Sequence, residues 1–86
     1  MGAIIKDIEK NSKEIIRIDI SEFKGQELIN LRVWFSSFDE NGNMVYKPTQ
    51  KGIAINISKY NDLREGIEKI GEYINDKKSG FKPEDV

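Results

Sequence analysis

The sequence predicts an α+β domain in which a curved, four-stranded antiparallel sheet is followed by one C-terminal helix (β-β-β-β-α). Ile is abundant, with 14 copies against three Leu, and β-branched side chains favour strands. Several segments before residue 58 alternate between apolar and polar residues, which is the period of a half-buried strand. From Tyr60 onward the apolar residues recur every three or four positions, which is the period of a helix.

The strand predictions rest on alternating segments that are separated by turn residues. The Asn41-Gly42 pair favours a hairpin because both residue types tolerate positive φ. Pro48 cannot donate a hydrogen bond to a sheet ladder, so the strand before it ends there or lies at a sheet edge. Thr49-Gln50-Lys51-Gly52 is expected to turn the chain again. The predicted strands are residues 14–20, 28–35, 44–47 and 53–57.

The predicted strand 28–35 presents two different faces. Alternation places Val33 and Phe35 on the apolar side, and Arg32 and Trp34 on the other. A single helix covers only one face of such a sheet, so the other must be solvated, paired with another chain or used for binding. On strict alternation Phe35 belongs to the core, and a β-bulge near Val33 would be needed to turn it outward.

The chain is expected to form one domain with short extensions. Residues 14–78 are assigned to the domain, residues 1–13 to an N-terminal extension that is either a short strand or disordered, and residues 79–86 to a C-terminal tail. Asn56 or Ser58 is expected to cap the start of the helix through a side-chain oxygen.

The predicted helix carries an apolar stripe that points to a second subunit. A chain of 86 residues is marginal as a monomer unless a disulfide, a metal or a partner stabilises it. We therefore expect a homodimer that buries part of the stripe between subunits. The interface candidates are Leu63, Ile67, Ile70 and Ile74.

Composition excludes several classes of function. The chain has no Cys and no His, so disulfides are excluded and both the usual zinc ligands and the commonest general base are missing. We expect no catalytic residues, no metal and no cofactor. No apolar run is long enough to span a bilayer, and the first residues lack a signal-peptide pattern. The expected location is the cytoplasm, with the nucleoid as the site in a bacterium.

The charge distribution limits how nucleic acid could bind. Fourteen Lys and Arg against 15 Asp and Glu leave a net charge of −1, so bulk charge does not attract a polyanion. Residues 42–61 are the exception, because they hold Lys47, Lys51 and Lys59 and no acid. Binding would therefore depend on locally segregated charge.

Aromatic and cationic residues are interleaved along the predicted sheet. Bases of single-stranded nucleic acid stack on exposed rings, at roughly 1–3 kcal/mol each, while cations contact the phosphates. The alternatives are that the rings belong to the core, or that the open face binds a partner protein. The candidate binding residues are Phe23, Lys24, Arg32, Trp34, Phe35, Lys47 and Lys51.

Several short motifs follow one another in a set order between residues 14 and 74. They are Phe23-Lys24-Gly25, Arg32-Val33-Trp34-Phe35, Lys47-Pro48, Lys51-Gly52-Ile53-Ala54-Ile55, and Tyr60 with Leu63. In this order they resemble the transcriptional coactivator family of positive cofactor four. The resemblance implies a homodimer, a preference for single-stranded or unwound DNA, little sequence specificity and no catalysis. RNA stays open as an alternative ligand.

The resemblance also implies roles for individual residues. Phe23 and Phe35 would be the stacking rings, and Lys24, Arg32, Lys47 and Lys51 would contact phosphates. Alternation along the strand favours Trp34 instead of Phe35, and both alternatives stay open.

The chain departs from the family pattern in four places. Gln26 and Ser21 stand where further basic residues are common, and Lys10 and Lys13 are candidates to compensate. The segment between the Arg32 and Lys51 motifs is longer than usual. No acidic or serine-rich tail follows, so a coactivator role is not implied.

Overall fold

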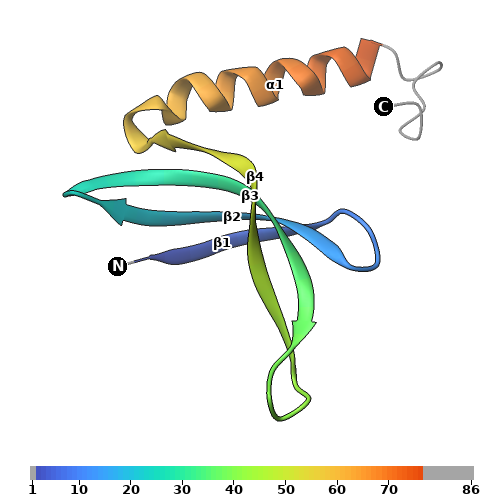
Figure 1. Cartoon of the computed structure of the whole chain (residues 1–86). Helices are drawn as coiled ribbons and strands as arrows, with labels where there is room; N and C mark the ends of the chain where they lie inside the picture. Colours follow the sequence, from blue (N-terminus) through green and yellow to red (C-terminus); the bar gives the residue numbers. More distant parts are fainter. Residues whose placement is uncertain (1, 77–86) are drawn as a thin grey trace.

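The computed structural model describes residues 2–76, which form an open sheet followed by a helix (Figure 1). The strands are β1 (Ala3–Glu9), β2 (Glu14–Phe23), β3 (Gln26–Phe38) and β4 (Met44–Asn56), and a 3₁₀ turn (Ile57–Lys59) leads into helix α1 (Tyr60–Asp76). The four strands pair antiparallel in the order β1-β2-β3-β4. The predicted class and element order are confirmed. The predicted tail 79–86 lies outside the described residues.

Two of the predicted strands form one continuous strand, β4. The segments 44–47 and 53–57 belong to one strand, and the turn predicted between them is wrong. Arg32 of β3 pairs with Gly52, whereas Trp34 pairs with Pro48. Residues 49–51 therefore lie opposite Val33 alone and form a β-bulge, which bends a strand without ending it. Pro48 is tolerated because β4 is an edge strand.

The N-terminal segment forms the fourth strand of the sheet, since the predicted strands 44–47 and 53–57 count as one. Ala3–Glu9 pairs with β2, for example Ile8 with Ile16, and its register shifts once between Ile4 and Lys6. Of the two alternatives for residues 1–13, the structure contains the strand. The sheet therefore begins before the predicted domain boundary at residue 14.

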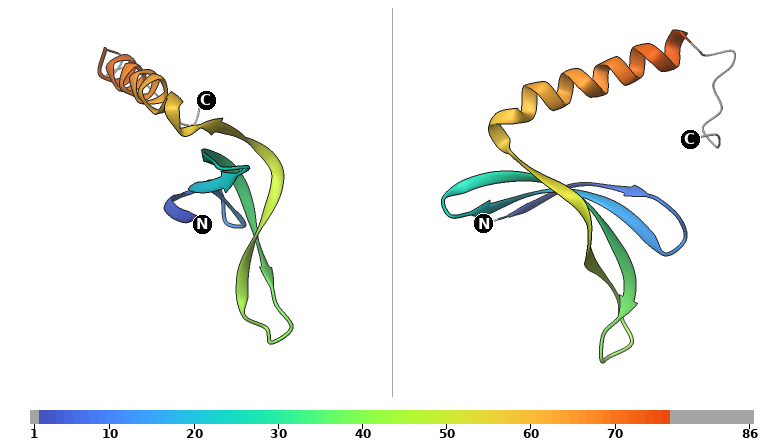
Figure 2. Two further views of the ribbon diagram at one scale, coloured as in Figure 1. Left: turned by 90° about the vertical axis from the view of Figure 1, so that its left-hand side faces the viewer. Right: turned by 45° about the horizontal axis from the view of Figure 1, so that its top comes forward.

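The sheet bends at the β4 bulge. Beyond it, the distal part of the β3–β4 hairpin leaves the plane of β1 and β2 (Figure 1). In both views of Figure 2 the tip of this hairpin and α1 lie at opposite ends of the molecule. Leu63 alone among the helix residues is half-buried, and the other residues of α1 are exposed. The helix thus leaves most of the sheet uncovered.

Few side chains are buried in the part of the chain that the structure describes. Among the described residues only Ile15 and Ile29 are buried, with 7% and 5% of their surface exposed. Ile29 lies between Ile20 of β2 and Ile55 of β4. A domain of this size usually depends on burying more than half of its unfolded surface, so a core of this extent is small for a monomer.

Turns and the helix cap follow local sequence chemistry. Lys24 and Gly25 have φ of 53° and 81°, which is the backbone of a two-residue hairpin turn. The Asn56 side chain accepts a hydrogen bond from Ser58 N at 2.9 Å and so caps the 3₁₀ turn. Asn56 Nδ2 also donates to Gln26 Oε1 at 2.6 Å, which ties the β2–β3 turn to the start of the helical segment. Of the two predicted caps, Asn56 is confirmed.

The hairpin between β3 and β4 closes through Asp39. Its Oδ1 accepts hydrogen bonds from Asn41 N and Asn43 N, both at 2.9 Å. Its backbone carbonyl accepts from Gly42 N at 3.1 Å. The hairpin predicted from Asn41-Gly42 is present, and the loop spans residues 39–43.

Candidate nucleic-acid interface

Three of the predicted interface residues gather beside the bend of the sheet. Phe35 of β3 lies opposite Lys47 of β4, and 39% of its surface is exposed. Lys51 is the last residue of the bulge, on the same strand as Lys47. Both lysines are exposed. We call Phe35, Lys47 and Lys51 the bulge group; it combines an exposed ring with two cations.

Phe35 reaches solvent without changing face. The β2–β3 register is unbroken from Glu14 opposite Phe35 to Phe23 opposite Gln26. Alternation therefore keeps Phe35 on the side of Val33. The bulge expected near Val33 is present, but it does not turn Phe35 to the other face. The bulge is in β4, and Phe35 is exposed because α1 does not extend over this part of the sheet.

Glu14 places a negative charge beside the bulge group and was not predicted to matter. Asn11 Nδ2 and Lys10 Nζ donate hydrogen bonds to its carboxylate at 2.8 and 3.2 Å. These bonds, with a smaller contribution from the charge of Lys51, lower the pKa of Glu14 below its usual range. Lys10 is therefore already paired inside the chain. In the sequence Glu14 is only the first residue of a predicted strand, and nothing in that pattern indicates a negative charge beside the bulge group.

Lys13, in the same turn, also lies at this end of the sheet. Its backbone carbonyl accepts a hydrogen bond from Ser36 N at 2.8 Å, which places it next to the strand position that follows Phe35. Its side chain is exposed. Lys10 and Lys13 are both close to the bulge group, and of the two only Lys10 has an ion-pair partner among the described residues.

A second group occupies the β2–β3 turn at the other end of the strands. Phe23 is 61% exposed, and Lys24 Nζ lies 5.3 Å from the centre of its ring. The paired strands separate Phe23 from Phe35 by nine residues, about 30 Å at 3.3 Å per residue. Alternation also places the two rings on opposite faces. One subunit therefore does not bring the two predicted stacking rings into one patch.

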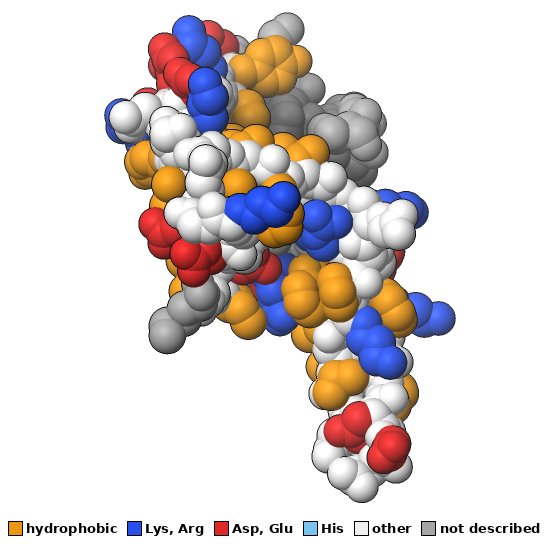
Figure 3. Space-filling view, turned by 60° about the vertical axis from the view of Figure 1, so that its left-hand side comes forward, with side chains coloured by type: hydrophobic (Ala, Val, Ile, Leu, Met, Phe, Trp, Pro, Cys, Tyr) orange, Lys and Arg blue, Asp and Glu red, His pale blue; other side chains and the backbone are white. Residues whose placement is uncertain are grey.

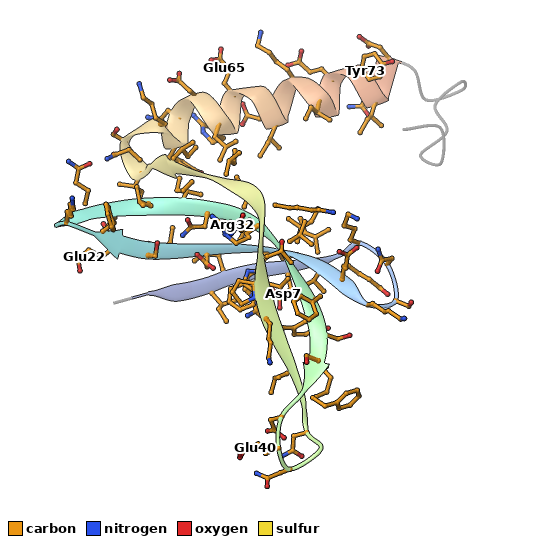
Figure 4. All side chains as sticks on the ribbon, in the orientation of Figure 1. Asp7, Glu22, Arg32, Glu40, Glu65 and Tyr73 are labelled. Carbon is orange, nitrogen blue, oxygen red and sulfur yellow. The ribbon has the colours of Figure 1, made fainter. Side chains whose placement is uncertain are left out.

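Trp34 belongs to a packed layer that crosses the sheet. The guanidinium carbon of Arg17 lies 4.6 Å from the centre of the Trp34 ring and 5.6 Å from that of Tyr46. Arg17 also donates two hydrogen bonds to Asp7, at 2.8 and 3.0 Å. Each of the four strands thus contributes one side chain to this layer, which the label of Asp7 locates in Figure 4. Trp34 Nε1 is buried, with no hydrogen-bond partner among residues 2–76.

The ion pair in this layer shifts the pKa values of both Asp7 and Arg17. The hydrogen bonds from Arg17 lower the pKa of Asp7 below its usual range, and the same contact raises the pKa of Arg17. No sequence motif points to either residue. Alternation does put Arg17 on the face of Trp34, but Asp7 lies in the N-terminal segment, for which the sequence predicts either a short strand or disorder.

Arg32 is half-buried and makes a contact inside the protein. Its Nη1 donates to the backbone carbonyl of Thr49 at 3.0 Å. Figure 4 labels Arg32 beside β4. The contact links Arg32 to the bulge itself, so its guanidinium is not directed only at solvent.

The remaining departures from the expected pattern have structural partners. Gln26 accepts the bond from Asn56, and Ser21 Oγ accepts one from Asn30 Nδ2 at 2.8 Å. The two polar residues that replace expected cations therefore hold strands and turns together.

The surface over the bend mixes apolar and cationic side chains. Figure 3 shows orange and blue side chains interleaved there, with acidic side chains at the hairpin tip, where Figure 4 labels Glu40. Within residues 2–76 no cluster of three or more acidic side chains could hold a metal ion. No described helix is long and apolar enough to cross a membrane.

Comparison with known proteins places this geometry in a family. Residues 10–66 match the family model of transcriptional coactivator p15 (PC4). The structure is similar to BPSL1147, a PC4 homologue from Burkholderia pseudomallei, in two crystal forms. The orthorhombic form has a TM-score of 0.65 and 26% identity over 81% of this chain and 89% of that one. The tetragonal form has the same TM-score and 25% identity, over 83% of this chain and 98% of that one.

A phage protein has the same fold at lower identity. The bacteriophage T5 homologue of the eukaryotic coactivator PC4, implicated in recombination-dependent DNA replication, has a TM-score of 0.58 and 18% identity over 90% of this chain and 81% of that one. The family match covers more than half of the sequence, and the motif order and strand order agree with it. This chain therefore belongs to the transcriptional coactivator p15 (PC4) family of DNA-binding proteins.

Proposed function

We propose that this protein is a non-enzymatic homodimer that binds single-stranded DNA with little sequence specificity. The observation that carries the proposal is the bulge group: Phe35 is exposed on an open sheet face, directly opposite Lys47 and near Lys51. A ring with adjacent cations suits a base and its phosphates together. Membership of the PC4 family supports the same ligand.

Low sequence specificity follows from the chemistry of the group. Every base has a stackable face, and a lysine contacts phosphates as a point charge, so neither contact reads base edges. The net charge of −1 means that attraction depends on local cations, and we assign phosphate contacts to Lys24, Lys47 and Lys51. Binding should weaken strongly with salt.

We assign the stacking role to Phe35 and Phe23, and a packing role to Trp34. The Trp34 ring is covered by Arg17, and a base could stack on that face only by displacing the ion-paired guanidinium. The separation of Phe23 from Phe35 within one subunit favours a strand that contacts them through different parts of a dimer.

The proposed homodimer uses the apolar stripe of α1. Ile67, Ile70 and Ile74 are exposed large apolar residues on this helix, and monomers rarely leave such a contiguous stripe in water. The small core of the single chain supports the same conclusion, because a second subunit would bury what the monomer cannot. A second copy of this chain is the partner we propose.

Two processes fit the proposal. The family is named for a transcriptional coactivator, and the phage homologue is implicated in recombination-dependent DNA replication. We propose a role of this chain in transcription or in DNA maintenance, each of which exposes single strands.

Fluorescence anisotropy of a labelled oligo-dT tests the proposal, with a duplex and an RNA of matched length as competitors. We expect binding to single strands that exceeds binding to the duplex, and a loss on Phe35→Ala. Phe38→Ala is the matched control, since Phe38 is a more exposed ring on the same strand, near the acidic tip. A wild-type chain that ignores single strands, and instead retains a protein partner through the same face, would favour the alternative of a protein-interaction module.

A further inference from the structure

The β4 bulge is tethered by one side chain at its first residue. Thr49 Oγ1 donates a hydrogen bond to the carbonyl of Val33 at 2.8 Å. The same oxygen accepts a hydrogen bond from Lys51 N at 3.1 Å. Thr49 therefore connects the middle of β3 to the backbone of the exposed lysine two residues further on.

Two further contacts hold the bulge on either side of this tether. Arg32 Nη1 donates to the Thr49 carbonyl at 3.0 Å, so Thr49 is held by both its side chain and its backbone. At the far end, a Cβ on Gly52 would lie 2.5 Å from Leu31 O and 2.6 Å from Arg32 Cα. Only glycine fits this approach, so β4 returns to the ladder at a set position.

The Thr49 hydroxyl cannot donate a hydrogen bond to a phosphate in this arrangement. A hydroxyl has one donor hydrogen, and that hydrogen is used on Val33. Thr49 is half-buried, whereas Gln50 and Lys51 are exposed. An effect of Thr49 on binding would therefore act through the residues that the bulge presents.

We propose that Thr49 is a positioning residue for phosphate contact. It holds the backbone of Lys51 so that the Lys51 ammonium meets the bound DNA strand beside Phe35. The proposal rests on the proposed function, because it assigns the cation that the tether serves. A lysine has a long, flexible stem, and ordering it on binding has an entropic cost. Holding its backbone in advance lowers that cost. Without the tether, residues 49–51 of the bulge would be free to shift opposite Val33.

Arg32 also has a structural role at the bulge. The family resemblance implies a phosphate contact for Arg32, but in this structure one guanidinium nitrogen holds the Thr49 carbonyl. Arg32 therefore holds the bulge, and Lys51 is its exposed cation.

Thr49→Val and Thr49→Ser separate the hydroxyl from the shape of the side chain. Valine keeps the branched shape and removes both hydrogen bonds, whereas serine keeps the hydroxyl. We expect Thr49→Val to weaken oligo-dT binding about three- to tenfold at low salt, as loss of one modest contact does. The salt slope should fall by up to about 0.7, the value of one phosphate contact on a single strand. Thr49→Ser should restore most of both.

A double-mutant cycle with Lys51→Gln tests whether Thr49 acts through Lys51. If it does, Thr49→Val adds little further loss in the Lys51→Gln background. Multiplicative losses, or equal binding by the valine and serine variants, would overturn the proposal. Thermal melting of each variant shows whether an affinity change reflects unfolding.

Amide exchange of Lys51 distinguishes failure of this inference from failure of the proposed function. The tether predicts that Lys51 N–H exchanges faster in Thr49→Val than in wild type or Thr49→Ser. If this holds and wild type binds, but the cycle is additive, the positioning role is wrong and the proposed function stands. If wild type does not bind single strands, the proposed function is wrong and the positioning role falls with it, whatever the exchange rates.

Discussion

Arg17 lies with its guanidinium 4.6 Å from the centre of the Trp34 ring while it donates two hydrogen bonds to Asp7. The contact joins three strands, and Tyr46 adds the fourth. Trp34 pairs with Pro48, the residue before the β4 bulge, so the contact lies where the sheet bends.

Removing Arg17 should destabilise the fold more than it affects DNA binding. A cation over a ring contributes about 0.5–2 kcal/mol, and hydrogen bonds to charged groups contribute about 1.5–3 kcal/mol. We expect Arg17→Ala to lower the free energy of unfolding by about 2 kcal/mol in urea titrations. Arg64→Ala is the control, because its ion pair with Glu68 is exposed at 3.2 Å and such pairs contribute about 0–1 kcal/mol. Equal losses in the two variants would argue against the layer.

Acid should weaken the same layer. Arg17 lowers the pKa of Asp7 below its ordinary value of 3.8, so the ionised form is favoured in the folded state. The stabilisation is therefore present above pH 3.8 and is lost as the pH falls through the lowered folded value. Asp7→Asn should be less stable than wild type at neutral pH and should lose less stability below pH 4. Parallel stability profiles of the two proteins would contradict this linkage.

Truncation of Trp34 should lower stability, whereas truncation of Phe35 should weaken DNA binding. Trp34→Ala removes a packed ring and should cost about 3–5 kcal/mol of stability. Phe35→Ala removes an exposed ring, so it should leave melting almost unchanged and weaken single-strand binding by about 1–3 kcal/mol. Calorimetry and anisotropy on the same samples separate the two effects. A Phe35→Ala variant that melts early and binds normally when folded would assign Phe35 to the core.

Replacing Lys47 and Lys51 together should change the salt dependence of binding. Each phosphate contact contributes about 0.7 to the slope of log K against log salt on single strands. Lys47→Gln with Lys51→Gln should therefore flatten the slope by about 1.4 and weaken binding to all base sequences alike. A loss confined to some sequences would mean that these residues read bases. Lys69→Gln, in the exposed helix, is the control.

The proposed dimer predicts a mass and a sensitive position. Sedimentation at micromolar concentration should report about twice 9.9 kDa. Ile70→Asp should abolish the dimer and unfold the chain, because the monomer buries only Ile15 and Ile29 among its described residues. Ile4→Asp is the matched control, since Ile4 and Ile70 are similarly exposed, 61% and 58%. A well-folded wild-type monomer at high concentration would contradict the dimer.

The sequence by itself determined the features that depend on neighbouring residues. Lys24-Gly25 supplies the positive φ values of a two-residue turn, and Asn56 caps the helical segment with its own side chain. Alternation assigned Trp34 and Arg32 to one face and Val33 and Phe35 to the other. The motif order identified the family. Each of these signals is local, because turn, cap and strand periodicity depend on backbone geometry within a few residues.

Only the tertiary structure decided which of these residues are available for binding. In the β4 bulge Thr49 bonds to Val33, 16 residues away, so the local pattern of turn residues predicts a turn where the structure has a bulge. Phe35 is exposed because α1 leaves its part of the face uncovered, and Trp34 is covered because Arg17 and Asp7 arrive from two other strands. The exposure of a side chain depends on which segments pack over it. Those segments are distant in the sequence, and local periodicity does not predict that they meet.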